Sequence, residues 1–189
     1  DKNVQEYDSL VVDIDTDPAI FLLLGRVKQG YIKANKIRLE EIKIDSIQAQ
    51  YQDLRLVNTS EGLKVVEGEN TFFQAVLTEE DLNQFLQKRY TEFEGLSLKL
   101  AKSGATLDLQ EEIFGQEVKM TLTGGFQFGE ENKVLFIPKD LKLQDIEVPK
   151  ILLSKIIRAV EFELDLDNFP LPLNLEDIAI EENRLVIEG

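Results

Sequence analysis

The sequence predicts an α+β fold, an elongated and curved antiparallel sheet with three helices packed on its concave side. Three observations predict it: repeated alternation of apolar and polar residues, short turns between the alternating runs, and three apolar segments that suit helices. The length of 189 residues, with 43% hydrophobic and 30% charged residues, fits one globular domain over residues 1–189.

The strands are predicted from alternation with a period of two, which is typical of strands with one buried face. The apolar positions of these runs are Leu10, Val12, Ile14; Leu96, Leu98, Leu100; Ala105, Leu107, Leu109; Val118, Met120, Leu122; and Val160, Phe162, Leu164, Leu166. Ser103-Gly104 and residues 129–132 read as hairpin turns. A last hairpin is predicted from Leu175 to Ile180 and from Leu185 to Ile187.

One stretch has a different period. Between Ile32 and Ala49, apolar pairs recur every five residues, namely Ile32/Ala34, Ile37/Leu39, Ile42/Ile44 and Ile47/Ala49. This period is compatible with a short solenoid of five-residue repeats. It is also compatible with bulged or winding strands whose inward face changes phase, as in a strongly curved sheet. The bulged strands are the preferred interpretation because the repeat does not recur elsewhere.

The first predicted helix is short and apolar on every side. Asp17 is its expected cap, Pro18 takes the first helical position, and Gly25 ends it. Its body is Ala19-Ile20-Phe21-Leu22-Leu23-Leu24. Because a helix without a polar face normally needs neighbours all round, we expect it to be sheltered.

Two further helices are predicted downstream. One begins at Thr78, with Asp81 as a capping partner, carries Leu82, Phe85, Leu86 and Phe93 on one stripe, and stops at Gly95. The other follows Pro149 and carries a wide apolar stripe from Ile151 to Val160.

The residue types that are missing exclude most catalytic chemistry. The chain contains no Cys and no His, so a thiolate nucleophile, an imidazole base and the usual zinc site are all excluded. Asp13, Asp15 and Asp17 have the spacing that opens an EF-hand loop, but Pro18 and Leu24 occupy the positions that need Gly and Glu. The expectation is therefore a protein that is not an enzyme and has no metal or cofactor.

The formal charge of −15 argues against nucleic acid as a partner, because there is no run of basic residues to displace counterions. The longest apolar stretch, Ala19 to Leu24, is too short to cross a bilayer. The chain starts at Asp1 rather than Met, which leaves room for a removed leader or anchor. The compartment is thus left open, with an extracytoplasmic or peripheral membrane location if such a segment was lost.

Several segments together resemble the LmeA-like phospholipid-binding domains of bacteria, a family long described as a domain of unknown function. The resemblance rests on Leu22-Leu23-Leu24-Gly25, on Asp53-Leu54-Arg55-Leu56, and on the helix start Leu77-Thr78-Glu79-Glu80-Asp81-Leu82-Asn83. It extends to Phe169-Pro170-Leu171-Pro172-Leu173 and to the closing Val186-Ile187-Glu188-Gly189. It implies phospholipid binding in a sheet-and-helix domain similar to tubular lipid-binding folds, with a role in envelope or membrane lipid metabolism and no catalytic residues.

The preferred function is non-catalytic binding of a phospholipid or another acyl-chain lipid in an apolar groove, with peripheral membrane contact. The residues expected to line the groove are on the three helices: Phe21, Leu24, Leu82, Phe85, Leu152 and Ile156. One alternative is a protein-interaction scaffold whose acidic strand faces meet basic partners, without a ligand cavity. Another is a hydrolase that depends on two buried carboxylates in one cleft.

Overall fold

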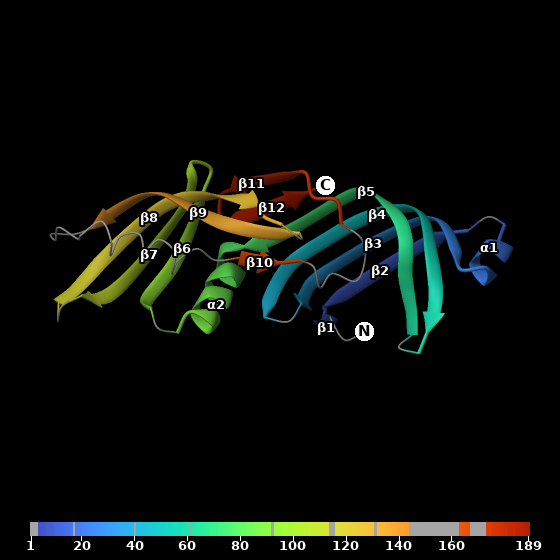
Figure 1. Cartoon of the computed structure of the whole chain (residues 1–189), viewed down its shortest axis with the longest axis horizontal. Coiled ribbons are helices and arrows are strands. Elements are labelled where there is room, and N and C mark those ends of the chain that lie inside the picture. Colours follow the sequence, from blue (N-terminus) through green and yellow to red (C-terminus); the bar gives the residue numbers. More distant parts are fainter. Residues whose placement is uncertain are drawn as a thin grey trace. The chain divides into compact units, whose positions relative to one another are not determined.

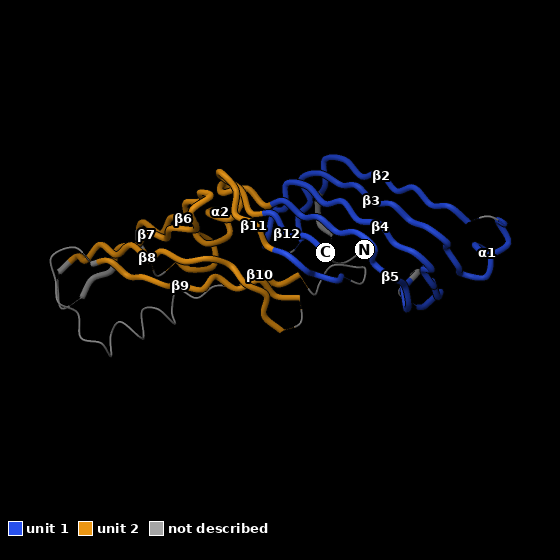
Figure 2. Tube along the Cα trace, turned by 90° about the horizontal axis from the view of Figure 1, so that it is seen from above, with its two compact units in different colours: residues 1–76, 168–177, 186–189 blue, residues 77–167, 178–185 orange. Residues whose placement is uncertain are grey.

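The computed structural model describes residues 4–16, 18–39, 41–60, 62–91, 93–113, 116–130, 132–143, 163–166 and 173–189. They form an α+β fold that consists mostly of antiparallel strands, with two short helices among the described residues (Figure 1). The chain divides into two compact units, and each unit is made of segments that are separate in the sequence (Figure 2). Unit 1 comprises residues 1–76, 168–177 and 186–189, and unit 2 comprises residues 77–167 and 178–185. The single domain over residues 1–189 stays a prediction.

Unit 1 is built on long strands that follow one another along the chain. Its elements are β1 (Val4–Glu6), β2 (Ser9–Asp15), α1 (Ile20–Leu23), β3 (Arg26–Leu39), β4 (Ile42–Thr59) and β5 (Gly62–Thr78). The sheet order is β1-β3-β4-β5-β12-β11, where β11 is Asp177–Glu181 and β12 is Arg184–Glu188, and β2 also pairs with β3. β1 pairs with the end of β3 at Leu39, whereas β2 pairs with its earlier part, so both lie on the same edge of β3. β4 and β5 bend along their length (Figure 1).

The five-residue period between Ile32 and Ala49 comes from strands whose buried face changes phase, as the preferred interpretation predicted, although the pairing of β3 with β4 shows no register shift that would mark a bulge. β3 and β4 keep one antiparallel register from Arg26↔Arg55 to Leu39↔Ile42, in which Lys36 is the position facing Asp45. Lys36 has φ 51°, in the left-handed region. Ala34 and Ile37 are three residues apart and are both buried. The buried face therefore changes phase at Lys36, and the apolar pairs on both sides of it reach the core.

Unit 2 contains a second antiparallel sheet, in the order β10-β9-β8-β7-β6. Its strands are β6 (Glu94–Ala101), β7 (Gly104–Ile113), β8 (Gln116–Phe128), β9 (Lys133–Leu143) and β10 (Glu163–Asp165). The predicted turns at Ser103-Gly104 and at residues 129–132 are found between β6 and β7 and between β8 and β9.

The predicted C-terminal hairpin is also confirmed, as β11 (Asp177–Glu181) and β12 (Arg184–Glu188).

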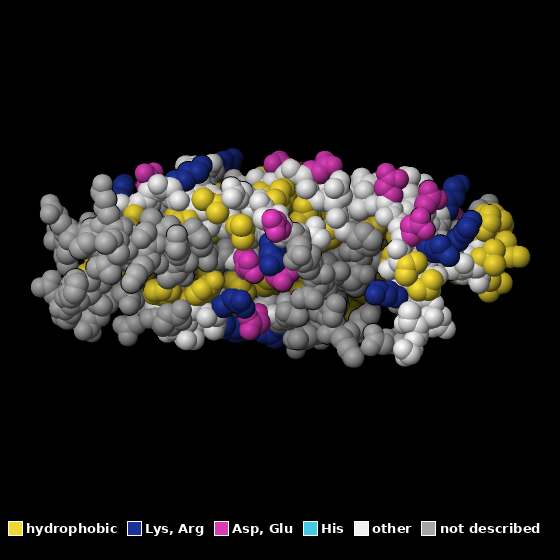
Figure 3. Space-filling model, in the orientation of Figure 1, with side chains coloured by type: hydrophobic (Ala, Val, Ile, Leu, Met, Phe, Trp, Pro, Cys, Tyr) yellow, Lys and Arg dark blue, Asp and Glu magenta, His cyan; other side chains and the backbone are white. Residues whose placement is uncertain are grey.

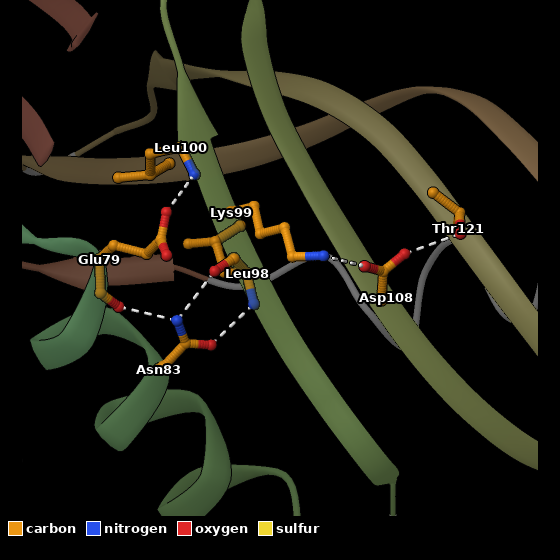
Figure 4. Close-up of polar contacts among 7 residues, drawn as sticks. All are labelled: Glu79, Asn83, Leu98, Lys99, Leu100, Asp108 and Thr121. Carbon is orange, nitrogen blue, oxygen red and sulfur yellow. Dashed lines mark hydrogen bonds and ion pairs between the residues drawn. The ribbon is translucent and has the colours of Figure 1, made fainter. Parts of the chain in front are cut away.

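One face of the unit 2 sheet forms a continuous apolar core. Leu98 lies opposite Leu107, and Leu107 lies opposite Leu122, so the predicted alternating positions line up across neighbouring strands. These three residues and Phe136 are each at most 1% exposed. On the other face, Asp108 accepts a hydrogen bond from Thr121 at 2.7 Å and faces Lys99 at 3.4 Å (Figure 4).

The helix α2 (Glu79–Arg89) begins as predicted at Thr78, whose hydroxyl oxygen accepts a hydrogen bond from the Asp81 N–H at 3.1 Å. The helix ends at Arg89, so the predicted extension to Gly95 is wrong, and Phe93 lies beyond it. The buried residues of α2 are Leu82, Phe85 and Leu86.

Two polar residues of α2 are bonded to the backbone of β6 (Figure 4). The Asn83 side chain accepts from the Leu98 N–H at 2.7 Å and donates to the Leu98 carbonyl at 2.8 Å. The Glu79 carboxylate accepts from the Leu100 N–H at 2.7 Å. β6 is the last strand of its sheet, so these side chains satisfy backbone groups that a neighbouring strand would otherwise pair. The helix-start motif of the sequence thus has a structural role.

We expect Asn83→Ala to lower the free energy of unfolding by about 2 kcal/mol, because it leaves two part-buried backbone groups of Leu98 without their partner. Urea denaturation of the variant measures this loss. The neighbouring Gln84→Ala removes only a long, exposed hydrogen bond to Glu80 at 3.3 Å, and it should change stability by less than about 0.5 kcal/mol. Equal losses in the two variants would contradict the role given to Asn83.

The prediction of three helices on the concave side is not confirmed. The third helix was expected within residues 151–160, which lie outside the described residues. The expectation that α1 is sheltered is wrong, because none of its residues is buried. Its composition gave a correct indication that it has no polar face, but a helix of four residues at the end of a strand can point outward without any covering layer.

Candidate functional site

The unit 1 sheet carries three rows of residues that face the same side. Residues directly opposite each other in antiparallel strands point to one face of the sheet, so the register defines these rows across β2, β3, β4 and β5. We call this face the inner face, and its rows are Leu10–Ala34–Ile47–Ala75, Val12–Ile32–Ala49–Phe73 and Ile14–Gly30–Tyr51–Asn70.

The inner face is closed on one side and open on the other. On β4 and β5, Ile47, Ala49 and Phe73 are each at most 1% exposed. On the edge strand β2, Leu10 is 47% exposed, Val12 51% and Ile14 48%. The same apolar surface therefore extends from fully buried residues on β4 and β5 to half-exposed residues on β2. Leu10 to Ile14 covers about 13 Å along the strand at roughly 3.3 Å per residue.

The two faces of β2 differ in character. The residues between the inner-face positions are Ser9, Val11, Asp13 and Asp15, three of which are polar. Val11 lies opposite Lys33 and is 55% exposed, which makes it nearly as accessible as Val12 but on the other side of the sheet. An apolar ligand on β2 would therefore find its surface on the inner face.

Tyr51 and Asn70 are the two polar side chains in the rows of the inner face. They lie directly opposite each other on β4 and β5, in the same row as Ile14. Tyr51 is only 1% exposed, and this burial raises the pKa of its phenol to about 12, against a smaller lowering by the neighbouring Asn70 side chain. The phenol is therefore neutral at every physiological pH.

The helix-borne residues predicted from the sequence lie in different environments. Phe21 and Leu24 are at α1 in unit 1 and are 38% and 66% exposed. Leu82 and Phe85 are fully buried in the core of unit 2. Leu152 and Ile156 lie outside the described residues. As lipid-binding residues, all six stay predictions.

The open margin on β2 was not recognised as a site from the sequence. Its alternation identified Leu10, Val12 and Ile14 as one face of a strand, but alternation does not distinguish a covered face from an open one. A weak signal existed nevertheless, because this run is followed after four residues by the all-apolar segment Ala19 to Leu24.

Within the described residues, no helix is both long enough and apolar enough to cross a bilayer. Those residues also contain no cluster of three or more Asp or Glu side chains with the geometry of a metal site.

In a comparison with protein-family models, residues 2–189 of the chain match the LmeA-like phospholipid-binding family. The search of curated proteins found no match, and neither did the search of solved structures. The resemblance stated from the sequence motifs is thereby confirmed over the whole matched range.

Proposed function

The chain belongs to the LmeA-like phospholipid-binding family, and we propose that it binds a phospholipid without catalysis, with an acyl chain lying on the inner face of unit 1. The observation that carries this proposal is the change in exposure along the rows. Fully buried apolar residues on β4 and β5 continue into half-exposed Leu10, Val12 and Ile14 on β2. An acyl chain placed there would complete the burial of the margin.

The energetics of such binding need little polar chemistry. Each methylene moved from water to an apolar surface gains roughly 0.8 kcal/mol, so ten buried methylenes gain on the order of 8 kcal/mol before the entropy of binding is subtracted. Leucine, valine and isoleucine side chains suffice as the surface. Tyr51 and Asn70 supply hydrogen-bonding groups in the row of Ile14, where a polar part of the lipid could be held.

Two adjacent residues of β2 provide a matched test. Val12→Asp places a carboxylate on the inner face, where it would have to be desolvated by the acyl chain. We expect it to lower the affinity for a monomeric short-chain phosphatidylcholine at least about tenfold, which is roughly 1.4 kcal/mol. Val11→Asp places the same charge on the other face of the same strand and should retain binding. Isothermal titration calorimetry measures both affinities.

Native mass spectrometry of the purified protein supplies the second measurement, with co-purified phospholipid expected on the wild-type chain and on Val11→Asp. Retention of lipid and affinity by Val12→Asp would place the ligand elsewhere. A wild-type chain that takes up no phospholipid, but is retained on a basic partner in a salt-sensitive manner, would support the acidic scaffold instead.

A further inference from the structure

We propose that α1 and the residue after it form a membrane-docking tip that inserts into the surface of a zwitterionic phospholipid bilayer. The tip consists of Ile20–Leu24, five consecutive large apolar residues whose exposed fractions run from 38% at Phe21 to 86% at Leu23. Figure 3 shows these hydrophobic side chains gathered at the end of unit 1 that carries α1. The inference goes beyond the lipid site proposed above and does not require it.

The tip is held in place by its backbone. A helix of four residues is far too short to be stable in water by itself. Here the Gly25 N–H donates to the Leu22 carbonyl at 3.0 Å, and the Gly25 carbonyl accepts from the Leu56 N–H of β4 at 2.6 Å. Gly25 has φ +71°, and a Cβ at this position would lie 2.2 Å from the Leu56 carbonyl oxygen. This backbone attachment leaves the side chains of α1 free to point outward.

The chemistry of the tip fits hydrocarbon better than a protein partner. From Ala19 to Leu24 there is no polar side chain. Protein interfaces combine their apolar contacts with about one hydrogen bond per 100–200 Å², so a protein-binding helix normally carries polar residues among its apolar ones. A bilayer interior requires none. Large exposed apolar patches on a folded protein mark interaction sites in general, and the composition of this one selects a lipid surface.

Basic residues follow the tip directly. Arg26 and Arg55 lie opposite each other on β3 and β4, and both are exposed. Like charges in this position repel each other, and an anion between them removes the repulsion. Arg55 lies 3.8 Å from Glu67, but both side chains are exposed, so this ion pair is weak. Lipid phosphates are anions of the required kind, and Figure 3 shows Lys and Arg side chains beside the apolar cluster.

The charge of the whole chain selects the type of surface. A formal charge of −15 opposes adsorption to a strongly anionic bilayer. A zwitterionic bilayer offers phosphates to Arg26 and Arg55 without a net negative potential. The dimensions also agree, because a helix is about 10–12 Å wide with its side chains and interfacial helices enter the bilayer by roughly 5–10 Å. Full insertion of α1 thus brings Arg26 to the level of the headgroups.

The absence of tryptophan from the chain allows a direct experiment. Leu23→Trp places a single indole on the tip, and Tyr7→Trp places one at an exposed site beyond the other end of β2, a strand that is about 20 Å long. On addition of phosphatidylcholine vesicles, the emission of Leu23→Trp should shift to the blue and be quenched by brominated acyl chains. The emission of Tyr7→Trp should stay unchanged. A tip indole that ignores the vesicles would overturn the inference.

Leu23→Asp is the complementary variant. In vesicle flotation we expect it to lower the fraction bound by a factor on the order of ten or more, with an unchanged circular dichroism spectrum because Leu23 is almost fully exposed. Its affinity for monomeric short-chain phosphatidylcholine should equal that of the wild type, since that ligand tests the inner face alone. Wild-type flotation by Leu23→Asp would overturn the inference, as would a dimer of the wild type that this substitution dissociates, because a second copy would then cover the tip.

Discussion

Gly124→Ala is expected to lower the free energy of unfolding by about 3 kcal/mol, although it adds only one methyl group. Gly124 lies in the middle of β8, where a Cβ would come 2.3 Å from the Ile137 carbonyl oxygen and 2.9 Å from the Pro138 Cα of β9. Both contacts are with backbone, so no side-chain rotation can relieve them. β8 and β9 would have to separate, and their ladder of hydrogen bonds would be broken on both sides of the substitution.

The adjacent residue provides the control. A Cβ at Gly125 would meet no atom within 4 Å, so Gly125→Ala should leave stability unchanged or raise it by up to about 1 kcal/mol through the lower entropy of the unfolded chain. Thermal unfolding followed by circular dichroism should show a midpoint for Gly124→Ala that is roughly 6–12 °C lower than that of Gly125→Ala. Similar midpoints would mean that β9 can shift at Pro138 without loss.

The irregular pairing of β8 with β9 beside Gly124 also explains how β9 accommodates a proline. Pro138 lacks the N–H that a central strand normally donates, and such a residue is tolerated where the ladder is irregular. The register between β8 and β9 shifts between Thr123 and Gly124, directly at Pro138. The role of Gly124 depends on Pro138, fourteen positions away, and could therefore not be read from the local sequence pattern.

The elements that were predicted correctly are those encoded by neighbouring residues. The alternation from Leu96 to Leu122 identified strands that the register now places side by side, and the helix start at Thr78 was recognised from its capping residues. Local hydrogen bonds and period-two burial decide these features, so a single segment contains the information.

The features that could not be predicted depend on which segments become neighbours. The bonds from Asn83 to Leu98 require α2 to lie on the edge of β6, and the open margin at Val12 requires that β3 be the only strand paired with β2 within the described part of the chain. The exposure of α1 is the clearest example. Its apolar composition was visible, but whether Leu23 meets a core, water or a membrane is decided by the surroundings that the fold provides.

The tip at α1 and the margin at β2 have different proposed roles within unit 1, membrane docking and acyl-chain binding. The tip at α1 and the margin at β2 are consecutive in the chain, and Asp15, the last residue of β2, is separated from Ile20 by four residues. A chain that docks at Leu23 would thereby hold the nearby end of the inner face, at Ile14, close to the bilayer surface. The two proposals are separable by experiment, because Leu23→Asp changes the tip and Val12→Asp changes the inner face.

The buried phenol of Tyr51 should make the folded chain less stable in alkali. The substitution Tyr51→Phe should abolish this loss of stability. Burial raises the phenol pKa to about 12 in the folded chain, whereas the unfolded chain ionises near the ordinary value of 10.0. Between these two pH values the unfolded state binds fewer protons than the folded state, so the free energy of unfolding falls as pH rises. The stabilisation is complete below pH 10, and about 2 kcal/mol of it is lost by pH 12, where the folded phenol is half ionised.

The difference between the wild type and Tyr51→Phe isolates this effect, because every other ionisable side chain is present in both proteins. Urea denaturation at a series of pH values should show the variant gaining about 2 kcal/mol relative to the wild type between pH 9 and pH 12. A difference that stays constant with pH would contradict the assignment. Since the shift is caused mainly by desolvation, it also tests the inner face, because a phenol with ready access to water could not hold its proton to about pH 12.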